Sequence, residues 1–164
     1  MQIVIEGPDA CGKSTLAKYL SEELGMRVIE GRGPERYPGE IDVRAREWLD
    51  IPGEALFDRH PCVSHQVYAT FSGAPLMKPS LVSEFYCRRN ILLIGCLPSD
   101  LPTEHQAKGY DTPEHLSMIG THKCGINQMY REWALKHAHI LYRVGDPMHL
   151  TLSLIRGARE YHAY

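Results

Sequence analysis

The sequence predicts an α/β fold in which helices cover both faces of a parallel sheet of roughly five strands. Short apolar segments alternate with longer segments of helical periodicity about five times along the 164 residues, and this order is typical of parallel sheets. Hydrophobic residues make up 43% of the chain and charged residues 23%, which suits one globular core. No internal repeat or linker interrupts the pattern, so we expect a single domain over residues 1–164.

The first third of the chain contains two expected strands and two expected helices. Residues 2–6 (QIVIE) are an apolar run that ends at a glycine, as a buried central strand does. Apolar residues then recur at helical spacing over 14–24 until the next glycine, and 26–30 form a second short strand. Residues 31–39 (GRGPERYPG) are rich in glycine and proline and predict a loop, after which the helical period returns over 40–49.

The middle of the chain repeats this order. Residues 55–57 are a brief strand, and apolar spacing predicts helices over 62–71 and 80–88. Residues 90–97 (NILLIGCL) are the most apolar segment of the chain and are too short for a typical helix. We therefore expect them to form a strand that is buried on both faces.

The last third begins with a polar segment, residues 98–123, which we expect to act as a lid. Within it, residues 112–114 (Thr-Pro-Glu) are typical of a helix start with proline at the first position. Further on, the pattern predicts a helix over 124–137, a final strand over 139–144 and a final helix over 148–161.

Composition excludes several classes of protein. The formal net charge of −2 argues against a general nucleic-acid coat. No apolar run approaches the roughly 18 to 20 residues that a bilayer requires, and no secretory pattern precedes the first strand, so we expect a cytoplasmic protein without a membrane partner. The five cysteines form no CxxC pair and the nine histidines lack ligand spacing, so we expect neither a disulfide framework nor a histidine metal site.

Residues 7–14 (GPDACGKS) fit the pattern GxxxxGK[ST] of a P-loop, or Walker A motif. Its glycines let successive backbone N–H groups face a phosphate, and the following helix adds its positive N-terminal end. Lys13 would bridge the β- and γ-phosphates of ATP, and the Ser14 hydroxyl would ligate Mg²⁺. The sequence thus predicts a three-layer α/β/α P-loop NTPase fold, with ATP and Mg²⁺ held around Gly7, Asp9, Ala10, Cys11, Gly12, Lys13, Ser14 and Thr15.

The P-loop alone leaves several enzyme classes open. A Ras-like GTPase needs an NKxD motif to read its base, and the sequence has none. A motor ATPase needs a longer chain with coupling elements. A small kinase is the class that remains.

A second motif, Asp58-Arg59-His60, directly follows the expected third strand. There Asp58 can reach the Mg²⁺ hydration shell, and Arg59 can fork onto an anionic acceptor phosphate. Ser64 and Tyr68 are four residues apart on the next helix and can face one pocket. A surface ion pair followed by an amphipathic core helix is the alternative explanation.

These two motifs resemble the thymidylate kinase-like branch of the nucleoside monophosphate kinases. That family carries an Asp-Arg-Tyr/His triplet followed by a serine and a tyrosine, here Asp58-Arg59-His60, Ser64 and Tyr68, and a P-loop acid, here Asp9. The resemblance covers residues 1–25 and 55–73. It implies that Asp9 contacts the acceptor sugar, Asp58 belongs to the magnesium network and Arg59 clamps the acceptor phosphate. The proline in DRHPCVS is similar to small bacteriophage-encoded kinases of this branch.

The chain departs from the family in its arginines. Relatives place a catalytic arginine in the P-loop or the lid, whereas this P-loop has Ala10 and Cys11, and residues 98–123 contain no arginine. Lys108, Lys123 and Arg131 are the candidate replacements. Contacts to the acceptor nucleotide are expected from Arg32, Arg36 and Arg44, with Tyr37 or Trp48 as a stacking platform. Arg143, after the last strand, is expected at the adenine of ATP.

The leading hypothesis is phosphoryl transfer from ATP to a deoxynucleoside monophosphate that carries thymine or a modified base. The first alternative is a kinase for a deoxynucleoside or for a nucleotide within DNA. Such a hydroxyl acceptor needs a general base, for which Glu6 and Glu30 are the candidates. The second alternative is a nucleotide-binding module without transfer activity. Relatives are often dimers through helices that flank the sheet, so a homodimer is also an expectation.

Overall fold

The computed structural model describes residues 1–97 and 112–161. Five strands form one sheet in the order β2-β3-β1-β4-β5, and every pair of neighbours is parallel. Their bounds are β1 (Gln2–Glu6), β2 (Val28–Glu30), β3 (Ala55–Asp58), β4 (Ile91–Cys96) and β5 (Ile140–Tyr142). The predicted α/β class with a parallel sheet of about five strands is confirmed.

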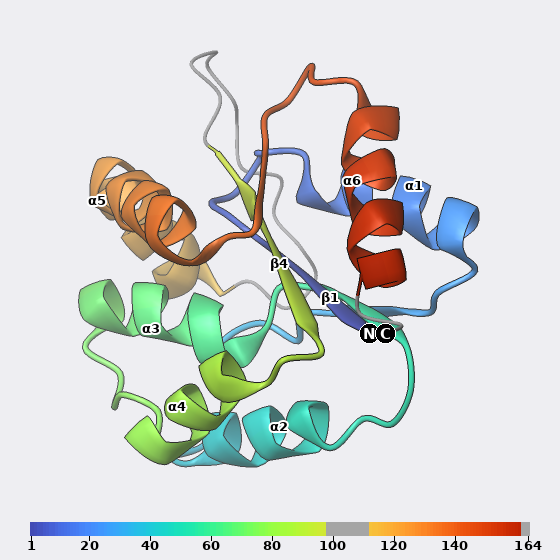
Figure 1. Ribbon diagram of the computed structural model, residues 1–164. Helices are drawn as coiled ribbons and strands as arrows, with labels where there is room; N and C mark the ends of the chain where they lie inside the picture. The colour runs from blue at the N-terminus through green and yellow to red at the C-terminus, as the bar shows by residue number, and fades with distance from the viewer. Residues whose placement is uncertain (98–111, 162–164) are drawn as a thin grey trace.

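Helices cover both faces of this sheet, which gives the expected three layers (Figure 1). One face carries α1 (Lys13–Leu24) and α6 (Met148–Tyr161), and the other carries the remaining four helices. Those four are α2 (Glu40–Leu49), α3 (Pro61–Ser72), α4 (Pro79–Cys87) and α5 (Pro113–His137). Among the described residues, no helix is both long and apolar enough to cross a membrane.

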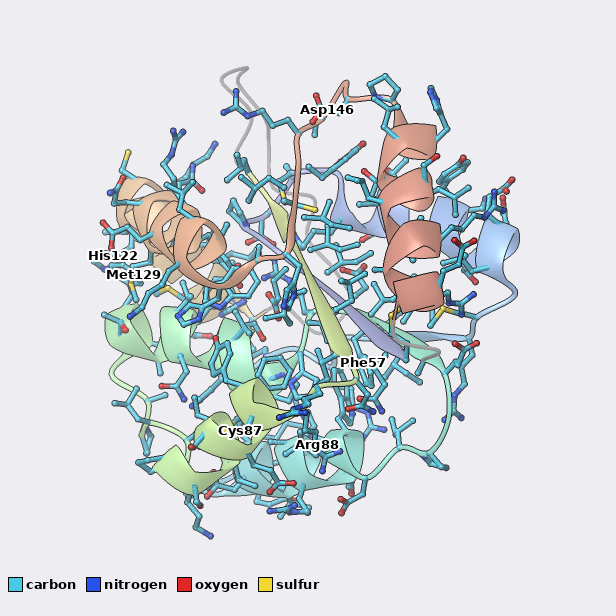
Figure 2. All side chains as sticks on the ribbon, in the orientation of Figure 1. Phe57, Cys87, Arg88, His122, Met129 and Asp146 are labelled. Atoms are coloured by element: carbon cyan, nitrogen blue, oxygen red, sulfur yellow. The ribbon has the colours of Figure 1, made fainter. Side chains whose placement is uncertain are left out.

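The core consists of two apolar clusters, one on each face of the sheet. Side chains of β1 alternate between them, because Val4 packs with the α2 to α5 side while Ile3 and Ile5 pack with the α1 and α6 side. Phe57, labelled in Figure 2, lies with Trp48 in the first cluster. Every residue of β1 is buried, as a strand covered on both faces requires.

The segment predicted as a lid differs from expectation where the structure describes it. Residues 98–111, including Lys108, lie outside the described residues. From Thr112 onward the chain is helical, because the Thr112 hydroxyl accepts the N–H of His115 at 3.2 Å and caps α5. The predicted start at residues 112–114 is therefore confirmed, and residues 113–123 form the first half of a helix predicted only from 124. A kink at His122 (φ −109°, ψ 15°) separates the halves.

Candidate functional site

The P-loop and the Asp58-Arg59-His60 motif lie side by side because their strands are neighbours. In the parallel pairing of β1 with β3, Ile5 lies opposite Asp58. Both strands end at the same edge of the sheet, so the two loops that follow them meet there.

The P-loop packs tightly against the end of β4. A Cβ atom at Gly7 would lie 2.3 Å from the carbonyl oxygen of Cys96, so this close approach admits only glycine. Lys13 is buried, and its ammonium donates to the carbonyl of Pro8 and lies 3.5 Å from the Cys11 sulfur. Ala10 has a positive φ of 58° and is exposed.

The N-terminus of α1 faces solvent at the P-loop. Gly12, with a φ of 78°, leads into the helix, and the side chains of Ser14 and Thr15 are exposed on its first turn. A helix N-terminus of this kind attracts phosphate through its free N–H groups and its positive end. The loop backbone and this helix start therefore fit a phosphate, and the role of Lys13 at the β- and γ-phosphates stays a prediction.

Ser14 and Asp58 meet in a way that suits Mg²⁺. The Ser14 hydroxyl donates to Oδ2 of Asp58 at 2.6 Å. Oδ1 of Asp58 is buried and has no hydrogen-bond partner among the described residues. Magnesium prefers hard oxygen ligands of this kind and retains several waters, so these two residues fit the ion predicted from the sequence.

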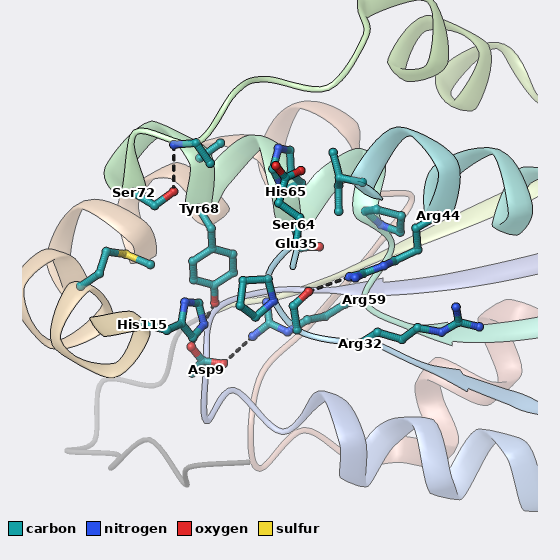
Figure 3. Close-up of a pocket in the computed structure, with 18 of the residues that line it drawn as sticks. Asp9, Arg32, Glu35, Arg44, Arg59, Ser64, His65, Tyr68, Ser72 and His115 are labelled. Carbon is teal, nitrogen blue, oxygen red and sulfur yellow. Dashed lines mark hydrogen bonds and ion pairs between the residues drawn. The ribbon is translucent and has the colours of Figure 1, made fainter. Parts of the chain in front are cut away.

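Arg59 lies between the P-loop and α5, and its guanidinium has several partners. Nη2 donates to Oδ1 of Asp9 at 2.5 Å and Nη1 to the hydroxyl of Tyr130 at 2.8 Å. The guanidinium also lies over the rings of Tyr68 and Tyr130, at 5.3 and 5.9 Å from their centroids. Tyr68 in turn donates to Oδ2 of Asp9 at 3.0 Å. Figure 3 shows Asp9 meeting both Arg59 and Tyr68.

A cavity of about 260 Å³ opens beside this cluster. The loop after β2 and the helices α2, α3 and α5 surround it, as the close-up in Figure 3 shows. Its lining includes most of the residues predicted to bind the acceptor: Asp9, Arg32, Arg44, Arg59, Ser64 and Tyr68.

The predicted acceptor arginines are placed unequally. Arg44 is buried and held by Oε1 of Glu40 at 2.9 Å and by the carbonyl of Gly33 at 2.6 Å. Arg32 lines the cavity but extends to Glu47 at 3.5 Å. Arg36 is 76% exposed, pairs with Glu40 at 2.7 Å and does not line the cavity. Its hydrogen bond is the main cause that lowers the pKa of Glu40 to about 2.

The loop after β5 flanks the P-loop, where the adenine of ATP was expected. A Cβ atom at Gly12 would lie 3.0 Å from the Val144 side chain and 3.5 Å from Tyr142. Arg143 precedes Val144 and is exposed, and its N–H donates to Asp146 at 2.7 Å. Arg131 is also exposed, on α5. Among the described residues, Arg59 contacts the P-loop through Asp9, whereas no hydrogen bond or ion pair joins the side chain of Arg131 or Arg143 to it.

Sequence reasoning missed the contributions of α5 to the site. Tyr130 is fully buried and receives Arg59, while His115 and Met118 line the cavity. The spacing of Ile126, Tyr130 and Ala134 in the sequence marks a buried helix face, and a buried tyrosine usually needs a partner for its hydroxyl. That pattern could have singled out Tyr130, but nothing local to it names Arg59 as its partner.

Among the buried titratable groups, Glu6 and Cys11 have pKa values that are shifted toward neutral pH. Burial raises the pKa of Glu6 to about 7, against the opposing charges of Arg59 and Lys13. Burial alone would also raise the pKa of Cys11, but a hydrogen bond with Cys96 and the charge of Lys13 outweigh it and lower that pKa to about 6. Of the two general-base candidates, Glu6 is 0% exposed and out of reach of a substrate. Glu30 is exposed at the end of β2.

Comparisons with known proteins identify the fold. No family profile matches the sequence, and no curated protein is similar to it in sequence. The YorR protein from Bacillus subtilis, solved in complex with phosphorylated GDP, is 20% identical with a TM-score of 0.70 over 100% of this chain and 99% of that one. Deoxyadenosine kinase from M. mycoides, solved with dCMP and dCDP, is 15% identical with a TM-score of 0.54 over 98% and 99%. At these identities the likeness shows a shared fold along the whole chain.

Proposed function

We propose that this protein is a nucleotide kinase that transfers the γ-phosphoryl group of ATP to a deoxynucleoside monophosphate, giving ADP and the diphosphate. The observation that carries the proposal is the contact of Asp9 with Arg59 at 2.5 Å. It joins a P-loop, which binds the donor, to a cavity of about 260 Å³ lined by arginines. An anionic acceptor suits this cavity because a guanidinium fork matches a phosphate.

The residues of the chain divide the work of an in-line transfer between them. Lys13 and the N-terminus of α1 hold the donor phosphates, and Arg59 orients the acceptor phosphate toward them. Asp9 and Tyr130 fix the guanidinium at 2.5 and 2.8 Å. Mg²⁺, when bound by Ser14 and Asp58, neutralises charge on the transferred group. A monophosphate acceptor needs no general base, because its oxygen is already ionised.

The solved neighbours support the class of reaction rather than the identity of the base. One was solved with phosphorylated GDP, and the other is a deoxyadenosine kinase. Phosphorylated GDP is consistent with a nucleotide acceptor, whereas a deoxyadenosine kinase is consistent with the deoxynucleoside acceptor of the second candidate. We retain thymine or a modified base as the proposed acceptor because of the resemblance to the thymidylate kinase-like branch, and a bacteriophage source for the same reason.

The proposal is tested by an ADP-release screen with ATP and Mg²⁺ against all natural dNMPs, NMPs and deoxynucleosides, and modified dNMPs. We expect turnover with at least one dNMP and no turnover with the matching deoxynucleoside. ATP binding without ADP release from any acceptor would instead indicate a nucleotide-binding module. Turnover of a deoxynucleoside or of a DNA 5′ end in preference to the dNMP would overturn the choice of acceptor.

A deoxynucleoside kinase is the second candidate, and the position of Glu30 favours it. Glu30 is exposed at the end of β2, and the next residue, Gly31, lines the cavity. A carboxylate there can take the proton of a 5′-hydroxyl. If this candidate is correct, Glu30→Gln lowers kcat on the deoxynucleoside by about a hundredfold or more. Under the leading proposal, the same change leaves kcat on the dNMP nearly unchanged.

A further inference from the structure

We propose that Glu6 is a positioning residue whose side chain holds the backbone after Arg59, so that the guanidinium of Arg59 stays aimed at Asp9. Glu6 would thereby couple the strand that carries the P-loop to the arginine that holds the acceptor. The inference rests on the proposed function, since it concerns the placement of Arg59 for an acceptor phosphate.

The starting observation is the backbone conformation of Arg59. Its φ is +75°, and among the described residues only Ala10 shares a positive φ without being glycine. A side chain in the left-handed region is strained, and such strain persists only where the surroundings impose it. The surroundings of Arg59 must therefore contain groups that fix its backbone.

Two hydrogen bonds from β1 supply that constraint. The N–H of Arg59 donates to the carbonyl of Ile5 at 3.0 Å. The next N–H, that of His60, donates to Oε1 of Glu6 at 2.5 Å. The peptide groups on both sides of the Arg59 Cα are thus held by the same strand. The first bond extends the backbone ladder, whereas the second depends on a side chain.

The bond from Glu6 has no evident substitute. His60 is 2% exposed, so its N–H would have no water to bond to if Glu6 were lost. His60 also stacks on Phe85, with ring centroids 4.5 Å apart, which keeps the chain buried here. Rotation of the peptide to find another acceptor would carry Arg59 out of its conformation and away from Asp9.

A role in holding Arg59 also explains why a carboxyl group is kept in the core. Glu6 is 0% exposed, and its Oε2 has no hydrogen-bond partner among the described residues. A buried carboxyl group is costly unless hydrogen bonds compensate for its lost hydration, and the N–H of His60 is the partner of Oε1. The charged groups that act on it are Arg59, Lys13 and Asp58, so it lies among the groups proposed for transfer. It has no access to substrate, which excludes a role as general base.

The test is a double-mutant cycle between Glu6 and Arg59. Glu6→Asp keeps the charge but shortens the reach to His60, and Glu6→Gln keeps the reach but removes the charge. Kinetics are measured with ATP and each of the four natural dNMPs. We expect Glu6→Asp to raise the KM of the dNMP about tenfold, and Glu6→Gln to raise it less, with the KM of ATP unchanged. In an Arg59→Ala background, neither change has a further effect.

Other outcomes overturn the proposal. If the effects of Glu6→Asp and Arg59→Ala multiply, or if the KM of ATP rises in parallel, Glu6 does not act through Arg59. If both Glu6 variants fail to fold while Arg59→Ala folds, Glu6 serves the core alone. Absence of turnover by the unmodified protein with every acceptor would instead refute the proposed function. A crystal structure of Glu6→Asp then decides the inference separately, since the inference requires that the φ of Arg59 or its contact to Asp9 change in that variant.

Discussion

At the scale of single residues, Arg59 has the contacts that most constrain the function. It reaches Asp9 of the P-loop, 50 residues away in the sequence, and Tyr130 of α5, 71 residues away. An arginine held on two sides in this way is preorganised, so little of its freedom is lost when a phosphate binds. The substitutions most informative about mechanism are therefore those that loosen Arg59 while leaving it in place.

Tyr130→Phe is the first such substitution. It removes the hydroxyl that accepts from Nη1 of Arg59 at 2.8 Å and keeps the buried ring. Hydrogen bonds to charged groups contribute about 1.5 to 3 kcal/mol, so we expect kcat/KM for the dNMP to fall by about tenfold or more. Steady-state kinetics measure this effect.

Tyr86→Phe is the matched control, because the Tyr86 hydroxyl receives the indole N–H of Trp133 at 2.7 Å and has no contact with Arg59. It should leave kcat/KM unchanged. Equal losses in Tyr86→Phe and Tyr130→Phe would mean that both act through stability and that Tyr130 has no special role.

Glu6 gives a second prediction, on the pH dependence of stability. Its pKa is raised from 4.5 to about 7 in the folded protein. The protonated side chain therefore contributes fully to the free energy of unfolding below pH 4.5, and this contribution is lost as pH rises through 7. The loss amounts to about 3 kcal/mol of unfolding free energy. Urea denaturation between pH 4.5 and 8 measures this decline together with an opposing rise from His60, because burial lowers the pKa of His60 to about 3 and its contribution to stability is lost as pH falls below 6.5.

The comparison that isolates this effect is Glu6→Gln, which cannot titrate. The difference in unfolding free energy between the two proteins should change steadily over the same pH interval. Glu40 has a pKa lowered to about 2, so its contribution to the free energy of unfolding is lost only as pH falls below 4.5. It therefore does not change the measurement between pH 4.5 and 8. A difference that stays constant with pH would show that Glu6 is not protonated near pH 7 in the folded state.

The sequence predicted individual site residues where a local motif defines them. Lys13 and Ser14 follow from the P-loop pattern, and Asp58 follows from its place after a strand. Arg36 was also predicted at the acceptor, but it lies in the loop before α2 and pairs with Glu40 at 2.7 Å. Its neighbours in the sequence could not show which side of the loop it faces. Tyr130 was missed because its partner is distant in the sequence.

At the scale of elements, α5 shows where local propensity fails. Two glycines, Gly120 and Gly125, lie in or near its first half, and glycine weakens a helix. Packing compensates, because Ile119 and Ile126 are buried on the inner face of the helix. This tertiary contribution is not visible in the sequence of the segment, so a helix start was predicted at 112–114 but a continuous helix only from 124. The observed helix brings His115 and Met118 to the cavity.

Gly95→Ala tests how closely α5 lies on β4. A Cβ atom at Gly95 would lie 2.6 Å from the Cβ of Ala134 and 3.0 Å from that of Ala138. Neither neighbour is a flexible side chain, so the helix must shift. We expect a loss of about 1 to 3 kcal/mol of unfolding free energy, measured by urea denaturation.

Gly157→Ala in α6 is the control for that substitution, since nothing lies within 4 Å of its added Cβ. Alanine is the better helix former there, and the variant should gain about 0.5 to 1 kcal/mol. If Gly95→Ala were as stable as the unmodified protein, the close approach of α5 to β4 would be wrong.

At the scale of the whole molecule, the strand order decides which motifs can meet. The alternation of strands and helices predicted a parallel sheet, but it did not define the order β2-β3-β1-β4-β5. That order places β1 between β3 and β4, so the P-loop borders both the Asp58 motif and Cys96. Which distant strands become neighbours depends on how the complete chain packs. The local patterns in the sequence predict the strands but not their order in the sheet.

If the P-loop binds a nucleotide as proposed, that ligand should stabilise the whole molecule, because it binds the folded chain and not the unfolded one. A ligand at one hundred times its Kd stabilises the native state by about 2.7 kcal/mol. For a chain of this size, that corresponds to a rise in Tm of roughly 5 to 10 °C. We expect ATP with Mg²⁺ to produce this shift in a thermal denaturation assay.

The metal and the lysine should contribute separately to that shift. Ser14 donates to Asp58 at 2.6 Å, where the cation is proposed to bind, so ATP with EDTA should give a smaller rise than ATP with Mg²⁺. Lys13→Ala should lose most of the rise and all turnover, because it removes the buried ammonium that lies within the P-loop beside Pro8 and Cys11. Asp58→Asn should retain the rise with EDTA and lose only the increment due to Mg²⁺. If Mg²⁺ added the same increment to Asp58→Asn as to the unmodified protein, Asp58 would have no part in holding the metal.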